Sequence, residues 1–482
     1  MIEFRPVLFV VGAQLVALAT TMVVPVLTEV FLGGVDWRAF LFAAAATLFV
    51  GGALVLATHA DRARLGLRQA FLMTSLSWFA AAAFGALPFT LLQVPLGVTD
   101  AFFEAMSAFT TTGSTVMIGL DHASPGILLW RGMMQWFGGI GIIVTAVAVL
   151  PMLQVGGMQL FRTESSDRSH KTLPRTAQLA TWIGLVYVGL TSMLVIGLWL
   201  AGMSFFDALI HAMTTIATGG LSTSDGSIGT FETPAIHWII TFGMIAGGMP
   251  FALFVAAARG QGRRLIRDSQ VHWYLATLGI VTLGVMIALM IVGHEDILVA
   301  LRLSAFNVVS VMTGTGYATA EYDRWGSYAP GVFVLLMFIG GCAGSASGGI
   351  KIFRFQILFA AAGLQIKKLI RPHGVFVAHF NDNPLSMEVV ESVLAFTLVF
   401  MACFALETVA LGIMGLDLTT AATASIATMS NVGPGIGEIV GPAGTYAALP
   451  VLAKWILAIG MLLGRLEFFT ILVLFAPSFW RP

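Results

Sequence analysis

Charged residues and cysteines are both scarce in this chain of 482 residues. Charged side chains make up 10% of the sequence, 24 acidic and 24 basic, and the mean hydropathy is +0.92. A soluble globular protein of this size is excluded, because its surface would need more charge. The zero net charge excludes a broadly basic nucleic-acid binder. Both cysteines lie inside apolar segments, which argues against a disulfide framework and against a thiolate metal site.

Motifs of the common enzyme classes are also missing. The sequence contains no HExxH, GxSxG or Walker A motif. Two glycine-rich stretches, 314–319 and 433–441, do not lie between a strand and a helix of a βαβ unit, so phosphate binding is a weak hypothesis. We therefore expect a protein that is not an enzyme and that carries no organic cofactor on this chain.

Long apolar runs fill most of the chain. Runs of about 20 residues fit the ~30 Å hydrocarbon core of a bilayer. The sequence therefore predicts an all-α polytopic membrane protein with about ten transmembrane helices. The ten apolar segments are 6–32, 36–59, 69–93, 126–155, 176–202, 235–258, 271–293, 330–366, 386–414 and 447–477.

Basic residues mark alternate loops, after the second, fourth, sixth and eighth apolar segments. The positive-inside rule places these loops and both termini in the cytoplasm, and the other, acid-leaning loops outside. The basic loops suit a docking face for a partner, but the positive-inside rule explains them equally well without one. Their basic residues are Arg62, Arg64, Arg68, Arg162, Arg168, Lys171, Arg175, Arg259, Arg263, Arg264, Arg267, Lys367, Lys368 and Arg371.

One pattern of residues occurs four times, in the outward loops after the third, fifth, seventh and ninth segments. Each copy is a short amphipathic stretch, too short to cross a bilayer, that runs into a strip of Gly, Thr and Ser. A glycine stands nine residues after the start of each copy, and successive copies lie roughly 100 residues apart. The copies read "EAMSAFTTTGST" from Glu104, "HAMTTIATGGLS" from His211, "NVVSVMTGTGYA" from Asn307 and "ASIATMSNVGPG" from Ala424.

A fourfold strip of this composition suits a cation pore. Irregular backbone at membrane depth is tolerated only where it lines a cavity or is packed in protein. Glycine allows positive φ, so four strips can turn their carbonyl oxygens toward one axis and replace the hydration shell of a cation. The short helix before each strip points its partly negative C-terminal end at the ion.

Two other classes of function remain open at this stage. The first is a cation-coupled secondary transporter, although such carriers usually show two-part, often inverted repeats. The second is an intramembrane enzyme that uses Glu104 and His211 or nearby Asp residues. Enzymes do not need four copies of a glycine strip, and Glu104 and His211 have no counterpart in the third and fourth copies.

At this point the sequence resembles the Trk/Ktr/HKT superfamily of potassium transporters, and the N-terminal helix pair makes it most similar to the TrkH branch. The matching stretches are "FRTESSD" at 161–167, "GSASGGIK" at 344–351, "NVGPGIG" at 431–437 and "GRLEFFT" at 464–470. The resemblance implies a potassium-translocating subunit of the bacterial inner membrane. It also implies a homodimer gated by a cytosolic, nucleotide-binding TrkA-like ring.

The resemblance assigns a potassium filter to the four strips. It divides the chain into an N-terminal helix pair (1–67) and four units of span, pore helix, strip and span (68–160, 161–260, 261–372 and 373–482). The strips differ from one another, so we expect looser selectivity against Na⁺ than in a fourfold-symmetric channel. The filter residues are Thr111, Thr112, Gly113, Thr218, Gly219, Gly220, Gly314, Thr315, Gly316, Asn431, Val432 and Gly433.

The stretch "GGCAGSASGGIK" at 340–351 interrupts the eighth apolar segment with poor helix formers. Close helix packing by small residues is one explanation. The resemblance favours the other, an intramembrane gating loop below the filter, with Lys351 and Arg354 reaching the cytoplasmic surface or the partner. The gate residues are Gly344, Ser345, Ala346, Ser347, Gly348, Gly349, Lys351 and Arg465.

Arg465 stands well inside the tenth segment, where a guanidinium is costly and usually faces a cavity or a partner. One hypothesis pairs it with Glu467, although residues two apart do not share a helix face. The resemblance favours the other, in which Arg465 lies in the pore under the filter and repels K⁺.

Four further polar residues receive structural interpretations. For Asp100 and Asp207, capping or packing at the start of the first two short helices is a better interpretation than an outer cation site. Arg131 and Lys454 start the fourth and tenth segments, where we interpret them as anchors that snorkel to the outer interface.

Overall fold

Helices form almost all of the protein in the computed structural model, which describes residues 3–58, 66–148, 157, 172–293, 295–381 and 383–481. Within these residues the strands are β1 (His379–Phe380) and β2 (Asn383–Pro384), an antiparallel pair shortly before α19. The fold is an all-α polytopic membrane protein, as predicted. The basic residues Arg62, Arg64, Arg162, Arg168 and Lys171, and the stretch 161–167, lie outside the described residues.

Seven apolar helical segments are long enough to cross a membrane by length and composition. Two bent helix pairs raise the number of candidate spans among the described residues to nine. The seven are α1 (Arg5–Thr21) with α2 (Val23–Leu32), α3 (Trp37–Thr58), α4 (Leu67–Gly85) with α5 (Leu87–Thr90), α7 (Pro125–Ala148), α10 (Thr172–Leu200), α15 (Ser269–Val292) and α19 (Met387–Ile413).

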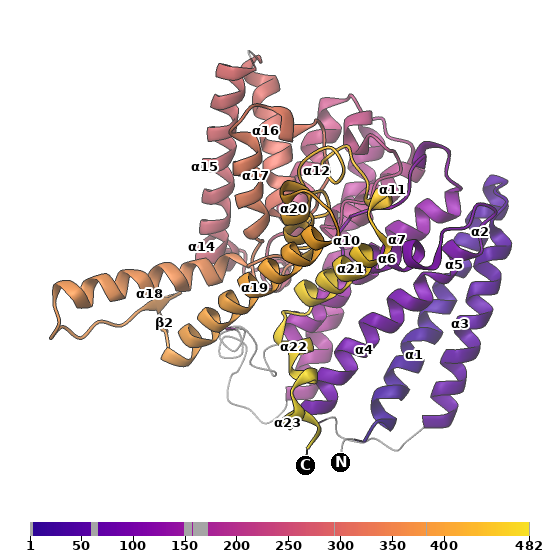
Figure 1. The fold of residues 1–482 in the computed structure, drawn as a ribbon, viewed down its shortest axis with the longest axis horizontal. Coiled ribbons are helices and arrows are strands. Elements are labelled where there is room, and N and C mark those ends of the chain that lie inside the picture. The colour runs from indigo at the N-terminus through magenta and orange to yellow at the C-terminus, as the bar shows by residue number, and fades with distance from the viewer. Residues whose placement is uncertain are drawn as a thin grey trace.

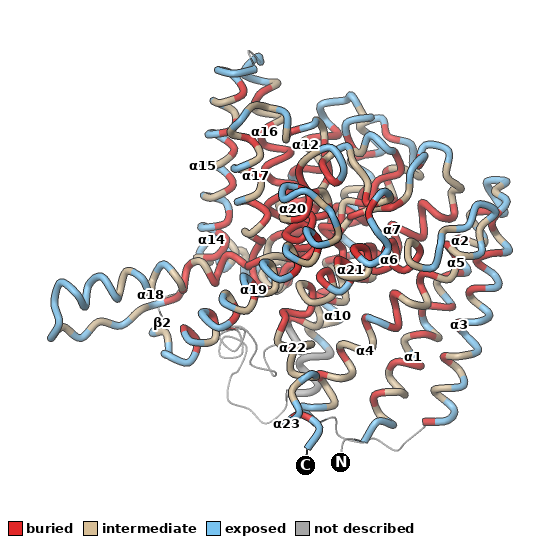
Figure 2. The backbone as a smooth tube through the Cα atoms, in the orientation of Figure 1, coloured by how far each residue is buried: buried red, intermediate tan, exposed pale blue. Residues whose placement is uncertain are grey.

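Four shorter helices lie in the middle of the molecule, where the buried backbone gathers in Figure 2. Each precedes one of the four strips, as the sequence pattern indicated. Their N-termini are capped in part by side chains: Ser204 and Asp417 accept hydrogen bonds from the backbone N–H groups of Asp207 and Thr420. They are α6 (Val98–Phe109), α11 (Phe205–Ile216), α16 (Ile297–Met312) and α20 (Leu418–Met429).

Three of the four spans that follow the strips are broken. α12 (Pro234–Gly247) and α13 (Phe251–Ala258) meet at 97° across Pro250, which offers no N–H to continue the helix. α17 (Ala329–Phe338) and α18 (Ile352–Ile370) are separated by the glycine-rich stretch predicted to interrupt them. α21 (Val451–Arg465) and α22 (Phe469–Leu472) bend by 106°, a break that the sequence pattern did not indicate.

The N-terminal helix pair packs closely and is fastened to the first unit. Side chains at Gly12 or Gly51 would collide with the facing helix, so these glycines let α1 and α3 approach each other. The carboxylate of Glu29, fully buried on α2, accepts hydrogen bonds from the N–H groups of Asp36 (3.0 Å) and Gly126 (2.6 Å). Gly126 is in the first turn of α7, so a negative charge sits at the positive end of that helix.

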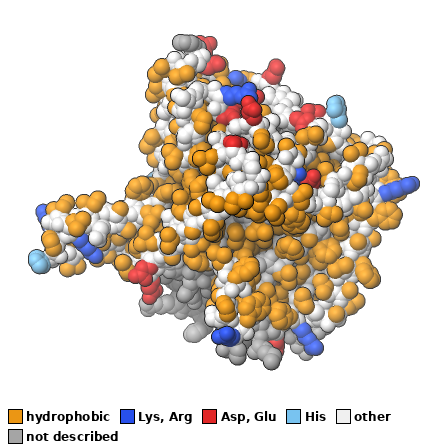
Figure 3. Space-filling model, in the orientation of Figure 1, with side chains coloured by type: hydrophobic (Ala, Val, Ile, Leu, Met, Phe, Trp, Pro, Cys, Tyr) orange, Lys and Arg blue, Asp and Glu red, His pale blue; other side chains and the backbone are white. Residues whose placement is uncertain are grey.

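Both chain ends lie at the same end of the molecule in Figure 1. α18 leaves the bundle sideways as an arm, and a return segment that includes β1 and β2 runs back along it to α19 (Figure 1). Figure 3 shows that the arm carries an apolar surface with basic side chains. Its exposed apolar residues include Phe359, Ile366, Leu369 and Ile370.

The remaining short elements connect the longer helices or lie near the C-terminus. They are η1 (Leu120–His122), η2 (Ser227–Thr230), α14 (Arg263–Arg267), η3 (Tyr322–Arg324), η4 (Tyr446–Ala448), η5 (Val473–Phe475) and α23 (Pro477–Trp480).

Candidate ion-binding site

Each of the four short helices ends in the same backbone motif, a Schellman turn. The N–H of the second residue past the helix bonds the carbonyl three positions back, and the next N–H bonds the carbonyl five positions back. The five-residue bonds are Thr112 to Ser107 (2.8 Å), Gly219 to Thr214 (2.9 Å), Thr315 to Ser310 (2.9 Å) and Val432 to Ala427 (2.8 Å). The repeat in sequence is therefore also a repeat in backbone hydrogen bonding.

The residue at the turn of each motif has a left-handed conformation. Its φ is +51° at Thr111, +50° at Thr218, +73° at Gly314 and +54° at Asn431. Glycine is the usual residue at this position of a Schellman turn, and a β-branched threonine there is a strained outlier. Gly314 thus occupies the same position in its turn as Thr111, Thr218 and Asn431 do in theirs. The third strip therefore has two glycines because one of them, Gly314, stands at this left-handed position.

The glycine two residues later is the one that recurs in all four strips. Its φ is also positive, between +72° and +101°, at Gly113, Gly220, Gly316 and Gly433. A side chain at each would run into a backbone carbonyl of the next strip. The carbonyls met in this way belong to Gly219, Thr315, Val432 and Thr112, in that order. The contacts therefore run from each strip to the following one and return from the fourth to the first, closing a ring.

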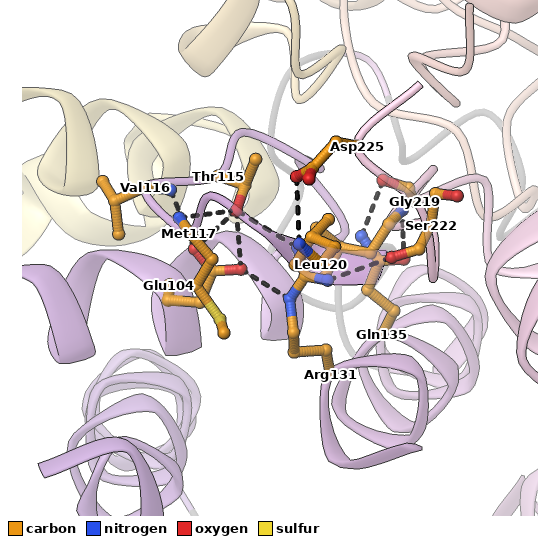
Figure 4. A network of polar contacts seen from close by, with 11 residues as sticks. Glu104, Thr115, Val116, Met117, Leu120, Arg131, Gln135, Gly219, Ser222 and Asp225 are labelled. Carbon is orange, nitrogen blue, oxygen red and sulfur yellow. Dashed lines mark hydrogen bonds and ion pairs between the residues drawn. The ribbon is translucent and has the colours of Figure 1, made fainter. Parts of the chain in front are cut away.

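Side chains behind the strips hold this ring. Gln135 of α7 donates to the Gly219 carbonyl (2.6 Å) and accepts from the Leu221 N–H (3.1 Å), as Figure 4 shows for Gly219. The hydroxyl groups of Ser114 and Tyr446 both donate to the Gly433 carbonyl at 2.8 Å. These bonds fix carbonyl groups that would otherwise turn freely in a segment with no regular structure.

A buried ion pair lies within the first unit, and its arginine also bonds the second unit (Figure 4). The Nε of Arg131 lies 2.7 Å from Oε1 of Glu104, and both side chains are at most 1% exposed. Glu104 also accepts from the Val116 N–H, and Arg131 donates to the Ser222 carbonyl, each at 3.0 Å. The interpretation of Arg131 as an interfacial anchor was wrong, because its side chain is buried and pairs with Glu104 of α6, 27 residues earlier in the chain.

His211 and Asp207 support the second strip from α11. The His211 ring contacts the Asp207 carbonyl (2.8 Å) and the Ser222 hydroxyl (3.0 Å) through its two nitrogens. Asp207 accepts from the hydroxyls of Ser204 (2.6 Å) and Thr223 (2.7 Å), while Ser204 holds the cap position itself. Asp207 is therefore an acid in the first turn of α11 that packs against Ser204 and Thr223, in keeping with its structural interpretation as a capping or packing residue.

Lys454 contacts the first short helix instead of the lipid interface. Its ammonium lies 2.6 Å from Oδ1 of Asp100 in the first turn of α6, and its side chain is 5% exposed. The interpretation of Lys454 as a snorkelling anchor was wrong. Asp100 gives a negative charge to the positive end of α6, and Lys454 neutralises that charge from α21.

The glycine-rich stretch 340–351 lies directly against the strips. The N–H groups of Cys342 and Ala346 donate to the carbonyls of Gly248 (2.9 Å) and Gly247 (3.1 Å), at the break between α12 and α13. A side chain at Gly348 would collide with the Ser430 carbonyl and with Asn431 of the fourth strip. The loop therefore packs against the breaks and the strips together. Its residues Gly344, Ser345, Ala346, Ser347, Gly348 and Gly349 form no helix.

Arg465 contacts this loop. Its side chain is 3% exposed and its Nη1 donates to the Ala346 carbonyl at 2.8 Å. Its Nε and Nη2 have no hydrogen-bond partner among the described residues. The hypothesis of an ion pair between Arg465 and Glu467 was wrong, because Glu467 faces other cations.

Glu467 pairs with the first residues of the helix that follows the loop. Its carboxylate contacts Arg354 through one oxygen and Lys351, at 3.7 Å, through the other. All three side chains are at most 5% exposed, so Lys351 and Arg354 do not reach the cytoplasmic surface as expected. Glu467 and the next residue, Phe468, both have positive φ, at the bend between α21 and α22.

A family model described as TrkH, cation transport protein, matches residues 37–481 of this chain. The chain belongs to the TrkH family. Full-length relatives agree with this assignment. The Trk system potassium uptake protein TrkI of Halomonas elongata is 43% identical over 480 residues, which cover 99% of this chain and 97% of the relative. TrkH of Escherichia coli K12 is 37% identical over 486 residues, covering 99% of this chain and all of the relative.

A solved TrkH structure has the same fold. The crystal structure of the potassium transporter TrkH from Vibrio parahaemolyticus matches this chain with a TM-score of 0.93 at 34% identity, and each chain covers the other completely. This TrkH-family chain is therefore a multi-pass membrane protein of a family of transporters, as the apolar segments and the resemblance indicated. Within the described residues no group of three His, Cys, Asp or Glu side chains is arranged to hold a metal ion.

Proposed function

We propose that this protein takes up potassium ions across the cell membrane through a pore lined by the four glycine strips. The observation that carries the proposal is the ring of contacts between successive strips, from Gly113 to the Gly219 carbonyl and onward around to Thr112. Carbonyl oxygens held around one axis replace the hydration shell of a cation. The related TrkI and TrkH proteins are named as potassium uptake proteins.

The transported ion is K⁺, held by carbonyl and hydroxyl oxygens of the strips and by no organic cofactor. Three strips carry at least one threonine, and the fourth carries Asn431, whose amide donates to the Thr112 hydroxyl at 2.9 Å. Because the four strips differ in side chains, the oxygen cage is irregular. We propose that it discriminates K⁺ from Na⁺ less strictly than a filter of four identical strips.

The glycine-rich loop and Arg465 form the gate of this pore. The loop touches the third and fourth strips through Gly348, and Arg465 touches the loop through Ala346. A guanidinium with two unpaired nitrogens repels a cation that approaches along the same path. Movement of the loop, together with Arg465, then opens or closes the pore.

We propose that two copies of the chain form a homodimer and that a cytosolic, nucleotide-binding TrkA-like ring regulates it. The exposed apolar face of the α18 arm supports the dimer, because an arm with such a surface is unusual outside an interface. The basic residues Lys367, Lys368 and Arg371 at the end of α18 support a cytoplasmic docking face. We place the chain in the bacterial inner membrane with both termini in the cytoplasm.

The proposed units follow the ranges drawn from the sequence: 1–67, 68–160, 161–260, 261–372 and 373–482. Each of the last four contains one short helix and one strip. The alternative function, a secondary transporter that couples K⁺ to H⁺ or Na⁺, would use the same strips.

Uptake of K⁺ or Rb⁺ into proteoliposomes tests the proposal. The purified protein is reconstituted, and flux is measured with an imposed gradient of K⁺, H⁺ or Na⁺ in turn. Flux driven by the K⁺ gradient alone supports a channel-like pore, whereas flux that requires a second gradient supports coupled transport. Absence of both K⁺ and Rb⁺ flux, with and without a cytosolic ring protein, would overturn the proposal.

A further inference from the structure

A carboxyl group lies buried in the membrane behind the fourth short helix. Glu407 is on α19, which packs against α20, and α20 in turn packs against α21 (Figure 1). The residue is 9% exposed, and its Oε1 has no hydrogen-bond partner among the described residues. An ionisable residue at membrane depth is costly and marks a functional site by default.

The surroundings of this carboxyl are shaped to receive it. A Cβ at Gly460 of α21 would lie 2.7 Å from Oε1 and 2.9 Å from Oε2 of Glu407, so only glycine leaves the group its space. Ser425 and Thr428 of α20 present hydroxyl groups to the same carboxyl. The pocket is thus formed by α19, α20 and α21. Glycine at position 460 leaves room for the carboxyl group, and any larger residue would fill that space.

Among the described residues, no counter-charge faces Glu407 from the helices packed around it. Within its bounds α20 carries no charged residue. On α21, Lys454 is engaged with Asp100, and Arg465 with the Ala346 carbonyl. On α18, Lys351 and Arg354 pair with Glu467. The other titratable groups close enough to interact electrostatically are Cys403, one turn earlier on α19, and Tyr446, and neither is a cation at neutral pH.

The neighbouring hydroxyls fit a carboxylic acid better than a carboxylate. Thr428 donates its proton to the Ala424 carbonyl (2.8 Å), and Ser425 donates to the Phe404 carbonyl (3.4 Å). A hydroxyl whose proton is used in this way offers only lone pairs to a third group. A carboxylate needs donors, whereas a carboxylic acid supplies one, so the acid form matches what the pocket offers.

The same turn of α20 carries the fourth strip. The Thr428 carbonyl accepts the Asn431 N–H (3.1 Å) in the Schellman turn, and Ser425 lies one turn before the helix ends at Met429. A change in the bonding of these two hydroxyls therefore acts on the residues that position Asn431 and Val432.

We propose that Glu407 is a proton-binding site that controls transport through the fourth strip. With the proton bound, the acid O–H bonds a hydroxyl of α20 and the strip keeps its position. When the O–H bond breaks, the proton leaves to water and a carboxylate remains, which accepts the hydroxyl protons of Ser425 and Thr428, draws them away from the Phe404 and Ala424 carbonyls and thereby displaces α20. The inference rests on the proposed ion transport, and it predicts full flux at low pH that falls as pH rises.

The test compares Glu407→Gln with the wild-type protein in proteoliposomes between about pH 6 and pH 9, a range in which buried glutamates in proteins titrate. Glutamine keeps the shape and the donor of the acid but has no proton to lose. Wild-type Rb⁺ flux should fall by up to about tenfold per pH unit beyond the midpoint, as the protonated fraction does. The Glu407→Gln flux should stay at its low-pH level throughout.

Glu388→Gln is the matched control, since Glu388 is an exposed glutamate at the other end of α19. It should keep the wild-type pH profile. An infrared titration of the purified protein gives a readout independent of transport: a protonated carboxyl band present in wild type, lost at alkaline pH, and missing in Glu407→Gln. Identical pH profiles of Glu407→Gln and wild type, or no such band, would overturn the inference. Absence of flux at every pH, with the band present, would count against the proposed function alone.

Discussion

Three of the four strips contain a strained non-glycine residue with positive φ. Thr111 and Thr218 take the left-handed conformation at the turn where Gly314 stands in the third strip. Such residues cost about 1–3 kcal/mol each and persist only where the surroundings over-determine them. The surroundings here are the two Schellman hydrogen bonds and the carbonyl of the next strip. The strips are therefore held in place by their neighbours and not by the preference of their own residues.

Replacing the recurring glycine of one strip should disturb selectivity. In Gly316→Ser the new Cβ would meet the Val432 carbonyl at a residue whose φ is +80°, so the fourth strip must move. We expect Na⁺ flux to rise relative to K⁺ flux, measured in the same proteoliposomes. Gly331→Ser is the control, because a Cβ there meets nothing within 4 Å. Unchanged selectivity in a folded Gly316→Ser protein would remove the third strip from the filter.

The buried pair of Glu104 and Arg131 should couple strongly. Either Glu104→Gln or Arg131→Met leaves one charge buried and unpaired, so each should lower the free energy of unfolding by about 3–5 kcal/mol. The double variant should lose less than the two single losses added together. Unfolding of the detergent-solubilised variants measures this. Strictly additive losses would show that the two side chains act independently.

At the scale of helices, the sequence predicts the elements that recur along the chain. It does not predict the helix breaks and ion pairs that depend on residues far away in the sequence. The four short helices and their strips followed from one comparison of four segments, because a recurring spacing needs no tertiary information. The break after Arg465 could not be predicted, since Leu466, Glu467 and Phe468 are not helix breakers. Its explanation is the pairing of Glu467 with Lys351 and Arg354, more than 100 residues away. Arg131 and Lys454 were misplaced for the same reason.

Removing Arg465 should raise cation flux. The Arg465→Ala change deletes a positive charge next to the proposed gate loop, two of whose nitrogens have no partner among the described residues, and deletes its bond to Ala346. A barrier lowered by about 1.4 kcal/mol raises the rate about tenfold. Rb⁺ uptake measures the effect, with Arg481→Ala as an exposed arginine control at the C-terminus. An uptake rate equal to wild type in the folded variant would exclude Arg465 from the barrier.

The carboxylate of Glu29 should fasten the N-terminal helix pair to α7. Glu29→Gln removes the charge that accepts the N–H groups of Asp36 and Gly126. Hydrogen bonds to charged groups contribute about 1.5–3 kcal/mol each. We expect faster amide exchange at the start of α7, measured by mass spectrometry. Glu3→Gln, at an exposed site, serves as the control. Equal exchange in both variants would contradict this role.

At the scale of the whole molecule, composition and charge pattern predicted the class of protein and the similar placement of the two termini. They could not predict the sideways course of α18, because periodicity shows that a segment is helical but not which way it points. The eighth apolar segment was long enough for one span, yet the chain turns at the glycine-rich loop and leaves the bundle.

Charges placed on the arm should separate the proposed dimer. Leu369→Glu introduces a negative charge at a residue that is 73% exposed, on the apolar face of α18. Light scattering of the purified protein should then report a monomer, whereas wild type should report a dimer. Ile118→Glu is the control, at a site that is equally 73% exposed but lies next to η1, away from the arm. A Leu369→Glu dimer would exclude this face from the interface.

The closed ring of strip contacts has a consequence for how the pore can be varied. In a channel assembled from four identical subunits, one mutation changes all four quarters of the filter at once. In the filter proposed for this chain the quarters belong to one polypeptide, so Gly113, Gly220, Gly316 and Gly433 can be altered one, two or three at a time. A mutation can therefore change the ion preference of such a filter through one strip at a time, while the other three strips keep their structure.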